Sequence, residues 1–210
     1  MTSSTQNEDS TSALMRDYPD GYEISTTTKK GLKILIRPMR RDDGPRLKVL
    51  FSSLSPKSIY FRFFMPLKAL SEEMLDSLTQ IDHDQDLVLV AAEKTVPEER
   101  ILGVFRLMRQ SNGETGELAI VVGDPWQGKG VAAKLFEHGL FISKEKGFGS
   151  VCGMVMGENK TVLALARRLG FTIRWDSEAH AFELRMDLKS IDPKHLIDSL
   201  HKEPGAGQSQ

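Results

Sequence analysis

The chain is poor in several features that would assign it to a class at once. It has a single cysteine among 210 residues, which excludes an internal disulfide. Its 28 basic and 29 acidic residues leave a formal charge of −1, without the basic excess of a nucleic-acid-binding protein. No apolar run is long enough to cross a membrane. We therefore expect no nucleic-acid or membrane partner, and a cytoplasmic location.

The two ends of the chain are poor in apolar residues. The first 21 residues are rich in Ser, Thr, Asn, Asp and Glu, and they have neither the basic start nor the apolar core of a secretory signal. Such a segment cannot bury enough apolar surface to offset the entropy lost on ordering. We expect a disordered arm over 1–21, one domain over 22–188, and a tail over 189–210 that is disordered or begins with a short helix at 191–200.

Between these ends the sequence alternates between helix and strand patterns. Hydrophobic residues make up 40% and charged residues 27%, as in ordinary globular domains. Crossover helices between strands, with antiparallel ends, predict an α/β fold on a mixed sheet. The expected strands are 23–27, 32–38, 86–92, 101–108, 117–122, 151–156, 171–175 and 181–186. The expected helices are 41–50, a short one opened by Ser55-Pro56, one from Ser71, one from about Gly128, and 161–169.

The most informative segment is 117–136, ELAIVVGDPWQGKGVAAKLF. It reads as an apolar strand, a turn at Asp124-Pro125 and a glycine-rich start of a helix. Glycine lets a ligand approach the backbone closely. The first N–H groups of a helix have no partner inside it and lie at the positive end of its dipole. The segment therefore predicts an anion site suited to a pyrophosphate.

The glycines fit neither of two well-known phosphate-binding patterns. They form no GxGxxG followed by a suitable acidic residue, and no GxxxxGK[ST]. They do match [Q/R]-x-x-G-x-[G/A], with Gln127, Gly130 and Ala132 in the fixed positions. This pattern resembles the acyl-CoA pyrophosphate loop of the GNAT superfamily of N-acyltransferases. The alternative is an ordinary strand–turn–helix connection in which the glycines serve only the turn.

A second motif follows in the order that this superfamily shows. The apolar strand 151–156 precedes Glu158-Asn159-Lys160 and a helix that Gly170 ends. The run ENKTVLALARRLGF is similar to the GNAT element in which an asparagine contacts the cofactor. Asn159 also suits the N-cap of the helix, and the two roles can coexist. The resemblance covers about 32–188 and implies a GNAT fold whose central strands splay apart around acetyl-CoA.

The resemblance also implies which residues hold acetyl-CoA. The backbone at the strand end pairs with the pantetheine arm like an added strand, and the glycine loop holds the pyrophosphate. The acetyl oxygen is expected at a backbone N–H near Val121, and no metal is expected. The implied cofactor-binding residues are Ile120, Val121, Val122, Gln127, Gly128, Lys129, Gly130, Val131, Ala132 and Asn159.

A longer resemblance concerns the acceptor of the acetyl group. The segment IRPMRRDDGPRLKVLFSSLSPKSIYFRFFMP, at 36–66, is similar to the start of the GNAT domain in bacterial protein lysine acetyltransferases of the Pat type. The run at 78–92 is similar to that family as well. The likeness implies a protein lysine as acceptor, for example on an acyl-CoA synthetase. Two alternatives stay open: acetylation of a small amine, and a non-catalytic protein that binds acyl-CoA as a sensor.

Glu117 is the candidate general base, because a lysine ammonium must lose a proton before it can attack a thioester. Its position resembles that of the catalytic Glu in Pat-type enzymes. We expect a carboxylate at the start of an apolar strand to be partly desolvated, which raises its proton affinity. The alternative is an exposed charge at a strand end, or an ion-pair partner of an arginine. Many GNAT enzymes carry a tyrosine as general acid where this chain has Ala166, which leaves open what protonates the CoA thiolate.

Two further features have plainer interpretations. Cys152 could carry an acyl group, but an apolar strand without a neighbouring histidine favours a packing role. The run Asp82-His83-Asp84-Gln85-Asp86 could bind a metal. Its side chains are too close in sequence to form a recognisable ligand set, which favours a solvated acidic loop.

Overall fold

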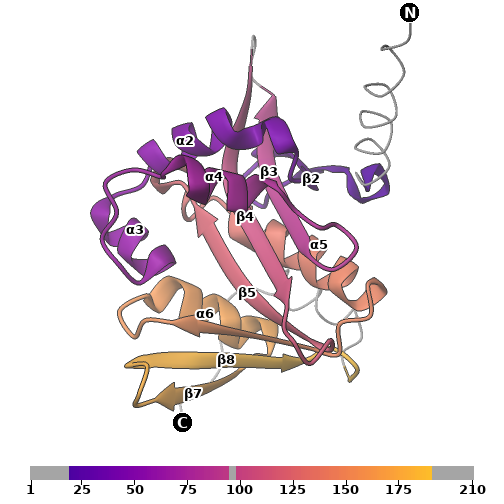
Figure 1. Ribbon diagram of the computed structural model, residues 1–210, viewed down its shortest axis with the longest axis vertical. Helices are drawn as coiled ribbons and strands as arrows, with labels where there is room; N and C mark the ends of the chain where they lie inside the picture. The colour runs from indigo at the N-terminus through magenta and orange to yellow at the C-terminus, as the bar shows by residue number, and fades with distance from the viewer. Residues whose placement is uncertain (1–18, 95–97, 191–210) are drawn as a thin grey trace, which may run out of the picture.

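A mixed sheet of eight strands runs through the protein in the order β1-β2-β3-β4-β5-β6-β8-β7 (Figure 1). The structure, a computed structural model, describes residues 19–94 and 98–190. The strands are β1 (Ile24–Thr27), β2 (Lys33–Pro38), β3 (Leu87–Lys94), β4 (Glu99–Arg109), β5 (Thr115–Val122), β6 (Ser150–Val155), β7 (Thr172–Asp176) and β8 (Ala181–Asp187). The helices are α2 (Gly44–Ser52), α3 (Pro56–Phe63), α4 (Glu72–Thr79), α5 (Val131–Glu145) and α6 (Lys160–Leu169), with short 3₁₀ helices η1 (Asp20–Tyr22), η2 (Arg41–Asp43) and η3 (Asp124–Trp126).

All the expected strands form, and the mixed α/β fold is confirmed. Two helix starts differ from expectation. The helix expected over 41–50 begins as η2 and becomes α2 only at Gly44, where Pro45 occupies the first turn. The helix expected from about Gly128 starts at Val131 instead, because the glycines before it adopt a left-handed backbone. The described residues begin within the segment expected as a disordered arm, and the expected tail helix at 191–200 lies outside them.

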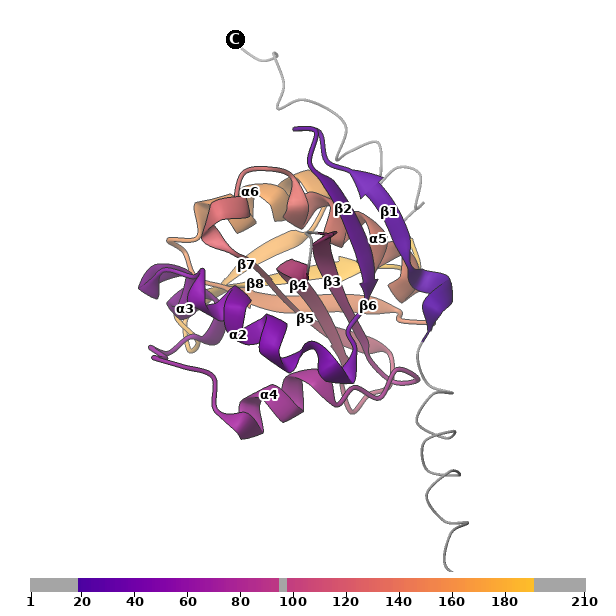
Figure 2. The same cartoon turned by 90° about the horizontal axis from the view of Figure 1, so that it is seen from above.

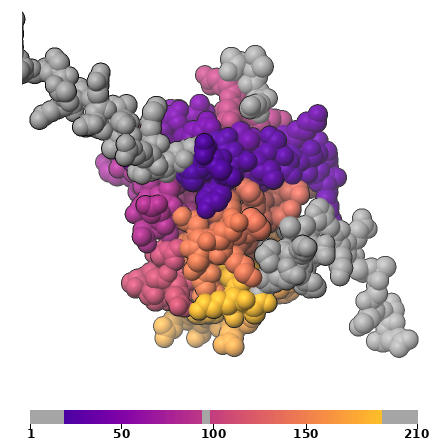
Figure 3. All heavy atoms as spheres, turned by 90° about the vertical axis from the view of Figure 1, so that its right-hand side faces the viewer, coloured from indigo at the N-terminus to yellow at the C-terminus, as the bar shows by residue number. Residues whose placement is uncertain are grey.

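Helices cover both faces of the sheet, with α5 on one side and α2 and α4 on the other (Figure 2). Strand β3 shows how the sequence builds both layers. Leu87 and Leu89 pack in the core under α5, whereas Val88 and Val90 pack in the core under α2. Successive side chains of a strand point to opposite faces, so a strand buried on both sides is apolar throughout. Figure 3 views the α5 side, where α5 lies between the N-terminal hairpin and the C-terminal strands.

The sheet opens at its centre, between β5 and β6. These two strands are its only parallel neighbours within the described residues, and they pair only from Thr115–Ser150 to Glu117–Cys152. Beyond that point β5 continues to Val122 without β6. A Cβ atom at Gly153 would lie 2.9 Å from the carbonyl oxygen of Leu118, so glycine is needed where the strands begin to part. The expected splay of the central strands is therefore present.

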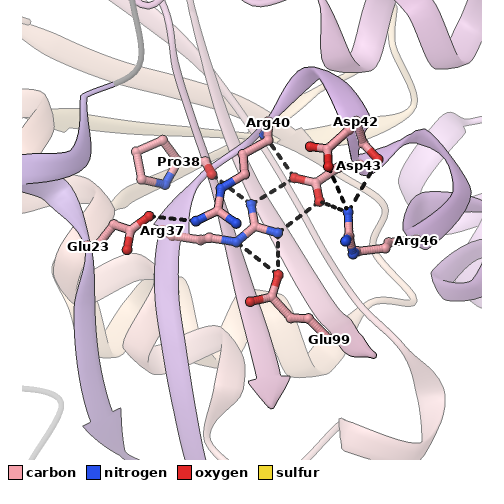
Figure 4. A network of polar contacts seen from close by, with 8 residues as sticks. All are labelled: Glu23, Arg37, Pro38, Arg40, Asp42, Asp43, Arg46 and Glu99. Carbon is pink, nitrogen blue, oxygen red and sulfur yellow. Dashed lines mark hydrogen bonds and ion pairs between the residues drawn. The ribbon is translucent and has the colours of Figure 1, made fainter. Parts of the chain in front are cut away.

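A buried ion-pair network fixes the helical layer to the sheet (Figure 4). Arg37, on β2, is fully buried and donates to both carboxylate oxygens of Asp43 at 2.8 Å. Its guanidinium also bonds to Glu99 of β4, with Nε 3.0 Å from Oε1. Burial acts to raise the pKa of Asp43, but the hydrogen bonds and charge of Arg37 outweigh it and hold that pKa below its usual value. This network positions the start of α2, which covers the site described next.

Candidate active site

The turn after β5 is shaped by two glycines with a left-handed backbone. Gly128 and Gly130 have φ angles of +67° and +90°, a conformation that glycine adopts without a steric penalty. A set of backbone N–H groups donates no hydrogen bond within residues 19–94 and 98–190: those of Gly128, Gly130, Val131 and Ala132. The positive end of the α5 dipole lies at the same place, and the side chain of Lys129 is exposed beside it. The loop is therefore equipped to bind an anion such as a pyrophosphate.

The side chain of Gln127 has a structural role that sequence analysis missed. Its amide nitrogen Nε2 lies 3.1 Å from the carbonyl oxygen of Val122 and 3.0 Å from Oδ1 of Asp124, and 3.2 Å from Oγ of Ser58 on α3. The other carboxylate oxygen of Asp124 accepts from the backbone N–H of Ser55 at 3.2 Å. Gln127 thus ties the strand end, the glycine loop and α3 together. Its side-chain amide is therefore occupied by these contacts, and its backbone N–H donates to the carbonyl of Asp124 at 3.3 Å.

The backbone of β5 has unpaired groups on the side of the gap. The N–H of Gly123 donates to the carbonyl of Leu102 at 2.9 Å, which fixes the phase of the antiparallel β4–β5 ladder. Backbone groups alternate in direction along such a ladder. Val121 therefore bonds toward β4, whereas Ile120 and Val122 direct their N–H groups toward the gap that β6 has left. The donors that can meet an acyl group in the gap are those of Ile120 and Val122, and the side chain of Val121 lines the α2–α3 side.

Asn159 lies between β6 and α6, directly before the first residue of α6. Its side-chain oxygen accepts from the N–H of Val162 at 3.3 Å, which is the N-cap role that its position before α6 predicted. Its side-chain amide group donates no hydrogen bond within the part of the chain that the structure describes. The N-cap therefore leaves two N–H donors for a ligand in the gap.

Glu117 is exposed, so the expected partial desolvation of its carboxylate is wrong. Glu117 lies near the start of β5, at the last residue that pairs with β6, where the gap begins. The alternative of an ion-pair partner is not observed either, since its carboxylate makes no hydrogen bond or ion pair within the described residues. Glu117 shares a face of β5 with Ala119 and Val121, toward α2 and α3. It lies within electrostatic reach of Arg62 on α3 and of Cys152, its neighbour on β6.

Cys152 is poorly suited to carry an acyl group. Burial raises the pKa of its thiol, and the negative charge of Glu117 raises it further. The sulfur is half-buried and lies 3.6 Å from Nε2 of Gln110. Because the thiolate is the nucleophilic form, a raised pKa makes this thiol less reactive near neutral pH. The surroundings of Cys152 support the packing role that the sequence favoured.

A small pocket of about 40 Å³ opens on the α2–α3 face of β4 and β5. Its walls are apolar apart from two arginines, Arg62 from α3 and Arg106 from β4. Burial and, to a smaller extent, the charge of Arg106 lower the pKa of Arg62 to about 10, against the opposing charge of Glu117. Burial also lowers the pKa of Arg106, against the charge of Asp86. Sequence analysis did not select these arginines, although the charge of Arg106 within the apolar run ILGVFRLM is a signal that could have found it.

At the position where the resemblance to GNAT enzymes implies a tyrosine as general acid, this chain has an alanine. Ala166 is fully buried on the inner side of α6. Of the described tyrosines, Tyr60 is exposed on α3, and Tyr22 lies in η1, where its carbonyl contacts His138. Tyr18 lies outside the described residues.

The acidic run at 82–86 forms a hydrogen-bonded loop. Asp82 accepts from the backbone N–H of Asp84 at 3.0 Å, and Asp86 accepts from the N–H of Arg109 at 2.8 Å. No group of three or more His, Cys, Asp or Glu side chains suited to a metal occurs within residues 19–94 and 98–190. In the same part of the chain, no helix has the length and apolar character needed to cross a membrane.

The chain is similar to known acetyltransferases. The model of the acetyltransferase (GNAT) family matches residues 56–171. The acetyltransferase PA5475 of Pseudomonas aeruginosa is 30% identical over 148 residues, which cover 70% of this chain and 80% of that protein.

Solved structures give the same result. The GNAT domain of S. lividans PAT is 27% identical, with a TM-score of 0.74, over 81% of this chain and 99% of that domain. The cAMP-binding acyltransferase from Mycobacterium smegmatis has a TM-score of 0.57 at 17% identity, over 94% of this chain and 63% of that chain, which is a likeness of fold.

Proposed function

Since this chain belongs to the acetyltransferase (GNAT) family, we propose that it moves the acetyl group of acetyl-CoA to the ε-amine of a protein lysine by direct attack. The observation that carries the proposal is a row of unpaired backbone donors along the gap. It runs from the N–H groups of Ile120 and Val122 to the start of α5. A thioester cofactor with a polar arm and a pyrophosphate has acceptors at both ends of this row.

Each predicted cofactor residue has a distinct task in this proposal. The N–H groups at the start of α5 hold the pyrophosphate, with the exposed Lys129 adding positive charge. The strand end at 120–122 pairs with the pantetheine arm, and the free amide group of Asn159 donates to it from the opposite wall. Gln127 contributes by fixing the loop to α3 and to the strand end. Bound acetyl-CoA supplies the activated acyl group.

Acyl transfer requires a neutral amine, a polarised thioester carbonyl and a CoA thiolate that can leave. Glu117 is the proposed base and takes the proton of the attacking amine directly or through one water. Its exposure supports a route through water. The N–H groups of Ile120 and Val122 are the proposed donors to the acyl oxygen, which gains negative charge during the attack. A thiol with a pKa near 8.5 can leave as the thiolate near neutral pH and take its proton from water.

The protein acceptor is supported by the surface next to the pocket and by the likeness to the GNAT domain of S. lividans PAT. Three large apolar side chains at the C-terminal end of α3 are exposed: Tyr60, Phe64 and Met65. Exposed apolar side chains gathered in one place mark protein-binding surfaces. A lysine on the surface of a folded partner, such as an acyl-CoA synthetase, can then enter the pocket while its surroundings contact α3. The rival functions remain a small amine as acceptor and a non-catalytic acyl-CoA sensor.

The test is release of free thiol from acetyl-CoA, with a panel of acyl-CoA synthetases and small amines across a range of pH. Wild type, Glu117→Gln and the control Glu145→Gln, at the exposed far end of α5, are compared. Turnover of a protein acceptor that falls about a hundredfold or more in E117Q alone supports both the reaction and the base. Turnover of small amines only would move the function to the first rival. Saturable acetyl-CoA binding with no turnover of any acceptor would favour the sensor.

A further inference from the structure

Two arginines face the reacting side of β5 without a carboxylate partner. Arg62 makes no hydrogen bond and no ion pair within residues 19–94 and 98–190, and its guanidinium lies 5.1 Å from the ring centre of Phe63. Arg106 donates from Nε to the sulfur of Met108 at 2.9 Å and from Nη2 to the carbonyl of Ser77 at 3.1 Å. Neither contact neutralises its charge.

Arg37, an arginine with a structural role in this protein, is paired differently from Arg62 and Arg106. Arg37 is bound by the two carboxylates of Asp43 and Glu99, and every part of its fork is occupied (Figure 4). A guanidinium held among apolar walls without such partners costs free energy, because it loses hydration and gains no counter-charge. Arg62 and Arg106 line one pocket and have no carboxylate in direct contact within the described residues, since Glu117 and Asp86 act on them only from a distance.

The register of the sheet puts this positive charge where the acceptor must arrive. Arg106 is opposite Ala119, which lies between Glu117 and Val121 on the same face of β5. Arg62 lines the same pocket from α3, within electrostatic reach of Glu117. An acceptor that brings only an ammonium group meets repulsion at this face. An acceptor that also brings a carboxylate supplies a direct ion-pair partner and can bind an arginine through two hydrogen bonds.

We propose that Arg62 and Arg106 form a recognition site for a carboxylate that the acceptor carries close to the amine to be acetylated. The inference rests on the proposed function and narrows its acceptor class. The carboxylate has two sources: an acidic residue beside the target lysine of a protein, or the α-carboxylate of an amino acid. The phosphates of the cofactor are not the ligand, because their proposed donors lie at the start of α5. Glu117 is not the partner either, since it forms no ion pair with Arg62.

The test measures kcat/KM for acceptors that differ in one carboxylate. The matched small acceptors are lysine and cadaverine, which lacks only the carboxylate. The matched peptides carry one lysine next to Glu or next to Gln. Wild type is compared with Arg62→Met, Arg62→Lys and Arg106→Met, and with Arg41→Met, an exposed arginine in η2, as control. The two acceptor pairs distinguish the two sources of the carboxylate.

Wild type and R41M are expected to favour the acidic member of at least one pair by about tenfold. R62M and R106M are expected to bring that ratio close to one, whereas R62K keeps part of it because the charge remains. A wild-type ratio of one in both pairs, or a ratio that R62M leaves unchanged, would overturn the proposal. A large preference for lysine alone assigns the carboxylate to an amino acid, and a large preference for the Glu peptide alone assigns it to a protein.

A second measurement does not depend on turnover. Glutarate, a plain dicarboxylate, is added at constant ionic strength while the Tm of each variant is followed. It should raise the Tm of wild type and R41M and leave that of R62M unchanged, because a ligand that binds only the folded state stabilises it. If no acceptor is acetylated but glutarate raises the Tm through Arg62, the proposed function fails and the carboxylate site stands. If glutarate raises no Tm, or raises that of R62M equally, the site fails.

Discussion

Thr28 packs against Gly130: a Cβ atom at position 130 would lie 3.2 Å from the Cβ of Thr28. Thr28 is buried, and its hydroxyl accepts from the N–H of Leu32 at 3.2 Å within the turn between β1 and β2. The turn of the N-terminal hairpin thus supports the entrance of α5, where the proposed pyrophosphate donors lie. Residues far apart in the sequence therefore fix the shape of one loop.

The first prediction concerns Gly130. Gly130→Ala should weaken acetyl-CoA binding about tenfold or more, because the left-handed backbone disfavours any Cβ and Thr28 blocks the space for it. The matched control is Gly147→Ala, at a φ of +75° with nothing within 4 Å of the new Cβ. Both variants should lose about 1 kcal/mol of stability from the backbone term. Calorimetric titration with acetyl-CoA then separates them, and equal affinities in the two variants would contradict the proposed loop.

The second prediction separates the two roles of Asn159. Asn159→Asp keeps a side-chain oxygen for the N–H of Val162 but loses the amide donors. We expect its Tm to stay near that of wild type while the KM for acetyl-CoA rises severalfold. Asn159→Ala should show the same rise in KM and lose about 1 kcal/mol of stability as well, because the cap is gone. If the KM of N159D for acetyl-CoA is unchanged, Asn159 does not bind the cofactor and acts only as the N-cap of α6.

The third prediction concerns the buried pair of Arg37 and Asp43. Asp43→Asn should cost about 3–5 kcal/mol of unfolding free energy, because it leaves the charge of Arg37 buried with one carboxylate fewer. The control is Asp42→Asn, whose side chain is 74% exposed and 3.6 Å from Arg46, a surface pair worth about 0–1 kcal/mol. Urea unfolding of both variants measures the difference, and similar losses would contradict the assigned importance of the pair.

The same pair predicts a pH dependence of stability. Because the folded protein lowers the pKa of Asp43, its contribution is complete above the unfolded value of about 3.9 and is lost as the pH falls through the lower folded value. Wild type should therefore lose stability on acidification below about pH 4 more steeply than D43N. Parallel slopes for the two proteins would show that another carboxylate carries the effect.

The fourth prediction uses Cys152 to report on Glu117 without any acyl transfer. The charge of Glu117 raises the pKa of the thiol, so Glu117→Gln should lower that pKa and speed alkylation by iodoacetamide at pH 8. Glu145→Gln serves as the control and should not alter the rate. Cys152→Ala should keep turnover within about twofold, because the proposed attack on the thioester is direct. A large loss of turnover in C152A would favour a covalent route.

Much of the fold follows from local sequence signals. The start of α3 at Ser55-Pro56 and the end of α6 at Gly170 were predicted from capping chemistry that depends only on neighbouring residues. The start of α5 was predicted too early, because the helical pattern of side chains does not reveal that Gly128 and Gly130 adopt positive φ. The splay of the central strands was predicted from the family resemblance rather than from periodicity, and the order of the strands was not predicted.

The site was predicted less completely than the fold. Glu117 lies at the expected place in the chain, but its exposure depends on where β6 departs and how far α3 reaches, and both are tertiary features. Arg62 and Arg106 lie 44 positions apart in the sequence, and only the packing of α3 against the sheet brings them into one pocket. An unpaired arginine cannot be told from a paired one in a sequence, since the missing partner belongs to the folded state.

The short ladder between β5 and β6 also makes the stability of the folded protein depend on ligand binding. The sheet consists of two parts, β1 to β5 and β6 to β8, and hydrogen bonds between them end at Glu117 and Cys152. A ligand that fills the gap bonds to both parts and binds only when both are folded. The free energy of unfolding then rises with the free concentration of that ligand, by RT ln(1 + [L]/Kd). A shortage of the proposed donor would therefore lower the stability of the protein as well as the proposed turnover.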